Sequence, residues 1–378
     1  MIYIHIPFCK QACHYCDFHF STSLKYKEEM LHTMQKEIDM RADYLTDKKI
    51  QSIYFGGGTP SVLSPTEIDK LIGHVSKHFE IANDAEITIE ANPDDLNPPK
   101  VKGLRQTAVN RFSIGIQSFF EEDLRWMNRA HNAVEADSAI KRVQDAGFEN
   151  ITADLIYGYP LLTDEKWVAN MQKLLDYNIP HISSYSMTVE QKTALAHLIT
   201  QGKTAPMAEA QSARQMNLLI ETLTSNGFEH YEISNFAKQE HYAKHNTSYW
   251  RGNHYLGIGP SAHSFNGSSR SWNIANNASY IQKLNTGEII SETEILTLED
   301  QFNEYVMTSL RTMWGISIPY LTERFGNGTV DYINNAVQGF AEKGQLKITS
   351  DNHICLTPEG KLIADHIASE LFLLNPDS

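Results

Sequence analysis

Cysteine is scarce in this 378-residue chain, which has four, and no apolar run approaches the roughly 20 residues that a helix needs to cross a bilayer. The N-terminal stretch MIYIHIPF does not combine a basic segment with a long apolar one, so we expect no signal peptide. Acidic residues outnumber basic ones: the chain has 46 Asp and Glu and 32 Lys and Arg, so its formal net charge is −14. We therefore expect no transmembrane segment and no general nucleic-acid binding, which requires a basic surface.

Internal repeats and low-complexity tracts are also missing. A hydrophobic content of 41% and a charged content of 21% are ordinary for a globular enzyme. The length suits one large domain with a smaller one. We expect a cytoplasmic protein, and disulfides are rare in that compartment.

Three of the four cysteines lie close together near the N-terminus, as Cys9, Cys13 and Cys16 in the pattern C-x3-C-x2-C. In a reducing compartment such a cluster indicates metal binding or catalysis. Structural zinc usually takes four ligands, which His14 or His19 could complete, so a zinc site stays open. Three thiolates suit a 4Fe-4S cluster better, because one iron then keeps an open position for chemistry.

Short β-rich runs alternate with amphipathic segments along the first half of the chain. This alternation predicts parallel βα units and an α/β fold. The expected strands are residues 2–6, 52–58, 86–92, 111–118, 150–158 and 181–188, and the clearest helices are residues 26–43, 65–78 and 133–146.

Residues suited to ligand binding fall at or near the ends of these expected strands. The run Gly56–Gly58 follows the second strand, Glu90 ends the third, Gln117 ends the fourth and Asp154 lies in the fifth. Glycines let a backbone approach a ligand, although an ordinary turn would need them too. Carboxylates on apolar strands need a partner, which is either a cationic ligand or a core ion pair.

The cysteine pattern followed by an aromatic residue, Phe18, resembles the signature of the radical S-adenosylmethionine (SAM) superfamily. The resemblance implies a partial (β/α)6 TIM-like barrel and a 4Fe-4S cluster whose open iron chelates SAM, which an electron from the cluster then cleaves. It implies that the glycine turn receives the SAM amino group and that Arg129 pairs with the methionine carboxylate. The positions that match SAM-contacting residues of the family are Tyr3, Gly57, Gly58, Thr59, Glu90, Gln117, Arg129 and Asp154.

Longer motifs narrow the resemblance to the oxygen-independent coproporphyrinogen III oxidase group, from residue 2 to about residue 370. They include IYIHIPFC, YFGGGTPS, EANPDDL, FSIGIQSF and ADLIYGYP. True decarboxylases of the group carry a fourth cysteine two residues after the third, and an N-terminal extension. Here Phe18 takes that position and the cluster begins at residue 9, as in the HemW-type heme chaperones. That branch binds SAM, a 4Fe-4S cluster and heme, and lacks the dehydrogenase activity.

The segment HNTSYW, residues 245–250, matches the HNxxYW motif of the same branch. A neutral imidazole is a good axial iron ligand, so the resemblance places His245 near heme, with Tyr249 and Trp250 packing on the macrocycle. Alternatively His245 only hydrogen-bonds a loop, and His241, His254 or His263 is the ligand. The Gly-rich residues 257–265 predict a tight turn at the barrel mouth and no phosphate loop.

The pattern changes near residue 295. From there helices, a hairpin and a last helix predict a mostly helical, winged-helix-like domain. From Leu296 onward five Lys and Arg face eleven Asp and Glu, which favours a lid or packing module over a DNA-binding one. We expect the divisions 1–235 for the barrel, 236–294 for a barrel-closing extension and 295–378 for the C-terminal domain.

Three functions therefore remain open at the level of sequence. The first is a SAM- and cluster-dependent heme chaperone with a hemoprotein acceptor, and the second is a coproporphyrinogen III decarboxylase acting on a porphyrinogen. The third is a structural zinc protein, which leaves Glu90 and Gln117 without a role. The missing fourth cysteine favours the first. We assign no catalytic residue, and a homodimer is possible.

Overall fold

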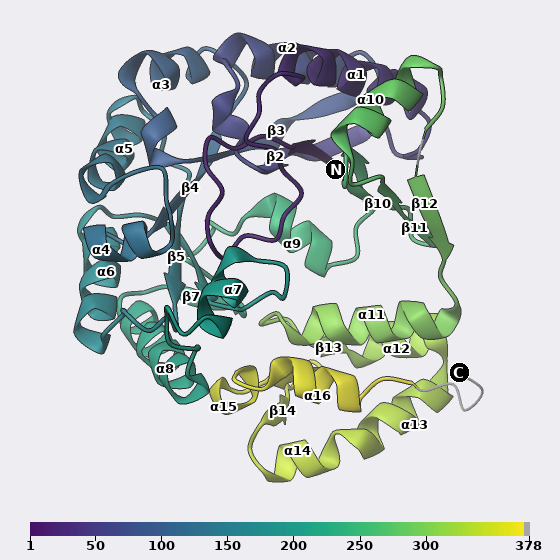
Figure 1. The fold of residues 1–378 in the computed structure, drawn as a ribbon. Coiled ribbons are helices and arrows are strands. Elements are labelled where there is room, and N and C mark those ends of the chain that lie inside the picture. Colours follow the sequence, from purple (N-terminus) through teal and green to yellow (C-terminus); the bar gives the residue numbers. More distant parts are fainter. Residues whose placement is uncertain (290, 374–378) are drawn as a thin grey trace.

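The computed structural model describes residues 1–289 and 291–373, and its largest feature is a curved β-sheet ringed by helices (Figure 1). Over these residues the sheet has nine strands in the order β7-β8-β6-β5-β4-β3-β2-β1-β9. They are β1 (Ile2–Ile6), β2 (Lys49–Gly57), β3 (Glu80–Ala91), β4 (Arg111–Gln117), β5 (Ile151–Tyr157), β6 (His181–Ser186), β7 (Glu229–Glu232), β8 (Asn235–Ala237) and β9 (Leu256–Ile258).

Strands β1 to β6 pair in parallel and in chain order, which confirms the predicted α/β fold. Each predicted β-rich run overlaps one of these strands, although β2 begins three residues and β3 six residues before the predicted start. Both edges of the sheet extend beyond the predicted strands. Residues 229–237 form the antiparallel pair β7 and β8, and residues 256–258 add β9 in parallel to β1. The expected turn at 257–265 is therefore confined to the residues between β9 and β10.

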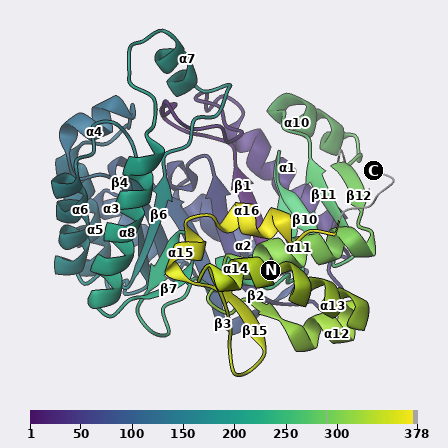
Figure 2. The same ribbon diagram turned by 90° about the horizontal axis from the view of Figure 1, so that it is seen from below.

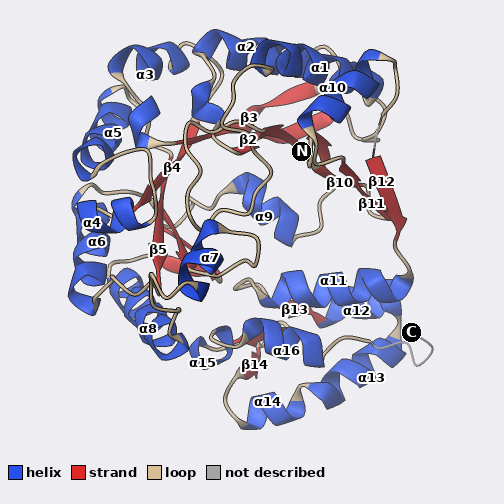
Figure 3. Cartoon of the chain, viewed as in Figure 1, coloured by secondary structure: helices blue, strands red, loops and turns tan. Residues whose placement is uncertain are grey.

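The helices that connect the strands cover the outer face of the sheet (Figures 1 and 3). Ser64 starts one of them with a capping box, in which its side chain accepts from the backbone N–H of Glu67. The barrel helices and connectors are α1 (Lys27–Met40), α2 (Pro65–Val75), α3 (Pro98–Leu104), α4 (Glu121–Trp126), α5 (Ala133–Asp145), α6 (Asp164–Asp176), α7 (Ala194–Thr200) and α8 (Glu209–Ser225), with short 3-10 helices η1 (Pro60–Val62) and η2 (Pro93–Asp95).

Strand β1 shows how apolar and polar side chains are divided between the two faces of the sheet. Ile2, Ile4 and Ile6 are fully buried in the apolar layer. The alternate residues, Tyr3 and His5, turn to the interior of the barrel, because successive side chains of a strand point to opposite faces. The interior therefore receives the polar residues of each strand, and that is where a ligand site can form.

Residues 236–294 add one helix to the barrel interior and a small sheet beside it. The helix is α9 (Lys244–Trp250), and the small antiparallel sheet has the order β10-β11-β12. Its elements are β10 (His263–Phe265), β11 (Ser269–Asn273) and β12 (Ser291–Ile295), accompanied by α10 (Asn277–Asn285). Since β8 and β9 belong to the main sheet, this segment is continuous with the barrel.

The C-terminal part packs around a hydrophobic core of its own (Figure 2). Helices are followed by a hairpin and a last helix, which is the predicted winged-helix order. Its elements are α11 (Leu298–Leu310), β13 (Ile316–Ser317), α12 (Ile318–Phe325), α13 (Asn327–Ala336), α14 (Gln338–Glu342), β14 (Leu346–Ile348), β15 (His353–Leu356), α15 (Pro358–Lys361) and α16 (Ala364–Glu370). The domain boundaries themselves stay a prediction, which this second core supports.

None of the helices among the described residues has the length and apolarity that a bilayer crossing requires. Cys355, the cysteine remote from the cluster motif, lies on β15 and is 5% exposed. It behaves there as a small apolar side chain.

Candidate functional site

The three clustered cysteines lie on the loop between β1 and α1, at the carboxyl ends of the parallel strands. The base of this loop is closed by Cys9 N–H donating to Ser21 O (3.0 Å) and Ser21 N–H donating to Pro7 O (2.9 Å). Farther along, the Asn128 amide donates to Ala12 O at 2.7 Å. The loop is thus held to the barrel by hydrogen bonds of its own backbone groups.

The thiols of Cys9, Cys13 and Cys16 line one large cavity of about 640 Å³. Among the described residues, the only trio of ligand atoms within 4.8 Å of one another belongs to Asp39, His74 and His78. Tetrahedral zinc with Zn–S bonds of about 2.3 Å needs sulfurs roughly 3.8 Å apart. The wider spacing of the three sulfurs therefore favours a larger metal group, such as a cluster.

The two histidines that could have completed a zinc site are engaged elsewhere. His14 Nδ1 lies 2.8 Å from Trp126 O, and His19 Nε2 lies 2.8 Å from Asn277 Oδ1. Neither residue lines the cysteine cavity. Among the described residues, the cavity lining therefore brings together three thiols and no histidine, which suits a cluster with one open iron.

The glycine turn after β2 packs directly against the start of the cysteine loop. Gly57 has a φ of 104°, and a Cβ there would come within 2.6 Å of the His5 ring. Gly58 N–H donates to Ile6 O (2.9 Å), and Thr59 N–H donates to Phe8 O (2.7 Å). The glycines were predicted to let a ligand approach, and the structure adds a second reason: they let β2 join the cysteine loop.

Arg129 connects this loop to the neighbouring strands. Its guanidinium donates to Asn92 Oδ1 (2.7 Å) and Gly115 O (3.0 Å), and lies 3.4 Å from Cys13 Sγ. Its Nε is buried and has no partner among the described residues. A buried donor without a partner is costly, so this atom fits the carboxylate of a bound amino acid such as the methionine part of SAM.

Glu90 and Asp154 present carboxylates to the same cavity. Tyr54 donates a hydrogen bond to Glu90 Oε1 at 2.8 Å, and Ser113 donates to Asp154 Oδ2 at 3.1 Å. Burial, aided by the charge of Asp154, raises the pKa of Glu90 to about 7. Burial likewise raises the pKa of Asp154 to about 6. Burial disfavours the charged form of both carboxylates, so a cationic ligand or a hydroxyl donor bound beside them would stabilise them.

Gln117 ends β4 in a left-handed conformation with a φ of 64°. The register between β4 and β5 shifts at this point, between Ile114 and Gln117. A non-glycine residue in this region is strained, and such strain concentrates at functional sites. The irregular end of β4 leaves Gln117 as a lining residue of the cavity.

Of the residues assigned to SAM by resemblance, Gly57, Gly58, Thr59, Glu90, Gln117, Arg129 and Asp154 all line this cavity. Tyr3 lines a second, smaller cavity instead, although a Cβ on Gly56 would touch both the Tyr3 ring and Glu90. Several lining residues were not predicted. They are Tyr15, Tyr54, Asn92, Ser113, Ser183 and Tyr185. For Tyr54, Ser113, Ser183 and Tyr185 the signal was the interior phase of the strand alternation, which polar residues on an otherwise apolar strand mark. Tyr15 lies on the cysteine loop and Asn92 follows β3, so alternation does not mark them.

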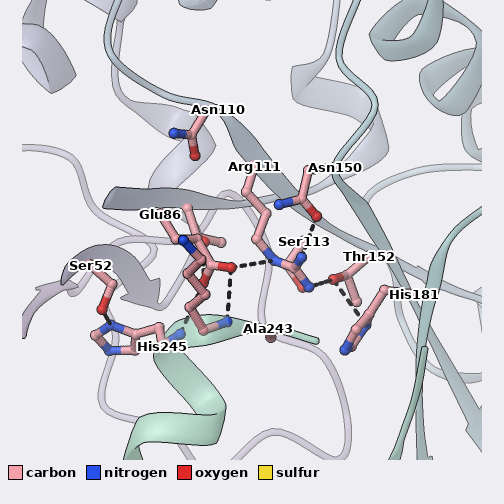
Figure 4. Close-up of polar contacts among 12 residues, drawn as sticks. Ser52, Glu86, Asn110, Arg111, Ser113, Asn150, Thr152, His181, Ala243 and His245 are labelled. Carbon is pink, nitrogen blue, oxygen red and sulfur yellow. Dashed lines mark hydrogen bonds and ion pairs between the residues drawn. The ribbon is translucent and has the colours of Figure 1, made fainter. Parts of the chain in front are cut away.

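His245 lies in α9, with its ring beside Ser52 of β2 (Figure 4). Its Nδ1 is 2.8 Å from Ser52 Oγ and its Nε2 is 2.9 Å from Tyr249 Oη. The side chain is fully buried, and burial lowers the pKa of the imidazole to about 3. With both ring nitrogens engaged, His245 has none left for iron in this conformation, so its contact with heme stays a prediction that the geometry does not favour.

A buried polar network fixes α9 in place, as Figure 4 shows. Glu86 accepts the backbone N–H groups of Lys244 (2.9 Å) and His245 (3.0 Å), and so caps the first turn of the helix. Arg111 lies 3.8 Å from Glu86 and donates to Thr152 Oγ1 at 2.5 Å. Ala243 and Asn246 line the large cavity, so the network forms its floor.

A parallel partial barrel with three cysteines between its first strand and first helix, a glycine turn after its second strand and a buried arginine beside the thiols defines a radical SAM protein. Residues 3–174 match the Radical SAM superfamily and residues 296–363 match the HemN C-terminal domain. The fold is similar to that of the solved coproporphyrinogen III oxidase HemN from Escherichia coli, with a TM-score of 0.84 at 23% identity over 98% of this chain and 89% of that chain.

Two relatives are more similar in sequence. The heme chaperone HemW of Bacillus subtilis (strain 168) is 32% identical over 368 residues, 97% of each chain. That of Lactococcus lactis is 34% identical over 332 residues, 86% of this chain and 84% of its own. The chain therefore belongs to the HemW branch of the HemN-like radical SAM family. Membership in the radical SAM superfamily implies SAM and a 4Fe-4S cluster.

Proposed function

We propose that this protein is a heme chaperone, which holds SAM and a 4Fe-4S cluster in its barrel, binds heme and delivers it to a hemoprotein acceptor. The observation that carries the proposal is the joint presence of a three-cysteine cavity with no fourth thiol and similarity to HemW proteins over 97% of the chain. The decarboxylase alternative rests on fold similarity to HemN alone.

Within the large cavity, each residue has a task that its contacts support. Cys9, Cys13 and Cys16 would hold the cluster, and Arg129, with its unpartnered Nε, would bind the SAM carboxylate. Glu90 would accept hydrogen bonds from the ligand while Tyr54 holds its carboxylate in place. When bound, the cluster supplies the electron for SAM cleavage.

Phe18 occupies the position at which a decarboxylase would carry its fourth cysteine. Its side chain is 71% exposed and lies on the rim of both cavities. An exposed aromatic ring at a cavity mouth offers an apolar surface to a flat ligand and no thiol for chemistry. This placement agrees with a binding role at the rim.

The decisive experiment compares two readouts on one anaerobically reconstituted preparation. Coproporphyrinogen III, SAM and dithionite are first supplied and the products are separated. Hemin is then titrated into the same protein. We expect no protoporphyrinogen and saturable uptake of hemin near one equivalent. Protoporphyrinogen formation without hemin uptake would establish the decarboxylase instead.

The proposal also covers the cellular location and the partners of the protein. We propose that the protein acts in the cytoplasm, where it delivers heme to acceptor apoproteins, and that it forms a homodimer. Analytical ultracentrifugation of the reconstituted protein measures the second point. The sedimentation coefficient of a monomer would contradict it.

A further inference from the structure

A second cavity, of about 390 Å³, lies beside the first and is lined by aromatic and histidine side chains. Its lining is Tyr3, His5, Asp17, Phe18, His19, Tyr249, Tyr255, Ser261 and His263. Asp17 is the one carboxylate among them. Pockets of 300–1,000 Å³ lined mainly by aromatic groups are typical of small-ligand sites. None of the residues assigned to SAM by resemblance lines it except Tyr3, so it is available to a second ligand.

The walls of this cavity suit a flat, conjugated ligand. Tyr249 and Tyr255 meet edge to face, with ring centroids 4.7 Å apart. On the other side His263 stacks on Trp272 at 6.0 Å, with 29° between the ring planes. Phe18 stands exposed at the rim. Aromatic rings that present faces and edges pack well against a macrocycle. The open rim leaves room for the part of the macrocycle that extends beyond the cavity.

Of the three histidines in this lining, His263 has the most accessible imidazole. His5 is 4% exposed, with Nδ1 3.3 Å from Tyr3 Oη and Nε2 2.9 Å from His19 O. His19 bonds Asn277 through Nε2. His263 is exposed, and neither of its ring nitrogens is hydrogen-bonded within the described part of the chain.

Its position on β10 directs this imidazole toward the cavity. His263 pairs with Trp272 across the small sheet, and the next pair on the same face is Phe265 with Arg270. The opposite face of β10 is buried, since Ser264 accepts from Arg41 at 3.1 Å. Partial burial and the charge of Arg270 lower the pKa of His263, so its ring is neutral near pH 7, as an iron ligand must be.

We propose that heme binds in this second cavity and that His263, rather than His245, is its axial iron ligand. The proposal rests on the heme-chaperone function proposed above. It also gives the HNxxYW motif a role at the same place: His245 bonds the Tyr249 hydroxyl at 2.9 Å and so orients one wall of the cavity. His245 is then a positioning residue.

The test uses the full-length reconstituted protein, with hemin titrated against a reference cell that holds the same cluster-loaded protein. We expect His263→Ala to weaken hemin binding at least about tenfold and to shift the Soret band. His32→Ala is the matched control, because His32 is an exposed histidine on α1 and is not part of the cavity lining. It should match the wild type.

Two further measurements separate iron ligation from packing. Iron-free protoporphyrin IX should bind the wild type and His263→Ala with equal affinity, while Tyr255→Ala weakens the binding of both porphyrins. Imidazole added to His263→Gly should restore the wild-type Soret band. If His263→Ala lost affinity for hemin and for iron-free porphyrin to the same extent, the ligand assignment would be overturned.

The outcomes also distinguish this inference from the proposed function. A wild type that takes up hemin, with an unchanged affinity and spectrum in His263→Ala, would overturn only the site. A wild type that takes up no hemin would overturn both. Loss of hemin ligation in His263→Ala, with imidazole rescue and intact iron-free porphyrin binding, would establish the site.

Discussion

The hydroxyl of Thr59 lies 3.2 Å from the sulfur of Cys9, so the end of β2 touches the first cluster cysteine directly. The backbone supports the same contact, because Thr59 N–H donates to Phe8 O at 2.7 Å. The glycine turn and the cysteine loop therefore form one structural unit. Residues that would bind SAM and residues that would bind the cluster are positioned together by it.

The first prediction concerns the three thiols of this unit. Cys9→Ala, Cys13→Ala and Cys16→Ala should each abolish the brown chromophore and lower the bound iron after anaerobic reconstitution, because no fourth side chain can replace a lost ligand. Cys355→Ala is the control, since Cys355 lies on β15 of the C-terminal part and outside the cavity lining. Iron content unchanged in all three variants would contradict a cluster at this site.

Arg129 should affect the affinity for SAM and not the amount of bound iron. Arg129→Gln removes the charged guanidinium with its unpartnered Nε, and losing charge-assisted hydrogen bonds costs about 1.5–3 kcal/mol, or roughly tenfold or more in SAM affinity. The amount of bound iron should change little. Equilibrium dialysis with labelled SAM measures the affinity. Arg125→Gln, at a side chain that is 76% exposed, is the matched control, and an equal loss in both variants would remove the special role of Arg129.

The pKa of Glu90 gives a pH-dependent prediction. Between its ordinary value of 4.5 and about 7 the folded protein keeps a proton that the unfolded chain has lost. Stability in the absence of SAM should therefore fall as the pH rises from about 4.5 to 7, by up to about 3 kcal/mol. Glu90→Gln has no such proton to lose and can still accept the Tyr54 hydrogen bond. Urea unfolding from pH 4.5 to 8 should show a smaller slope in the variant. Equal slopes would mean that Glu90 is ionised throughout.

Much of the barrel could be predicted because its signals are local. Strand β1 and helix α2 follow from side-chain alternation, a capping Ser64 and a helical apolar face, all within a dozen residues. The candidate ligands Glu90 and Gln117 could be placed for the same reason, since the end of a parallel strand is itself a position in the site.

The remaining features depend on partners distant in the sequence. The pairing of β9 with β1 joins segments about 250 residues apart, and nothing near residue 256 indicates it. Which of the two cavities Tyr3 lines could not be predicted either, because the boundary between the cavities forms only when β1 and β2 pair. The same limit applies to His245. A histidine that ligates iron and one that bonds Ser52 look alike in a motif, and only the folded contacts separate them.

The final prediction separates these two roles for His245. His245→Ala leaves the Ser52 and Tyr249 hydroxyls without a buried partner and opens a cavity beside α9, which should cost about 2–4 kcal/mol and lower the thermal midpoint by several degrees. Tyr249→Phe removes only one hydrogen bond and should cost about 1 kcal/mol. At a temperature where both variants are folded, His245→Ala should still show an iron-ligated Soret band, with its affinity reduced through the misplaced Tyr249 ring. Loss of that band with an unchanged thermal midpoint would instead make His245 the ligand and remove the case for His263.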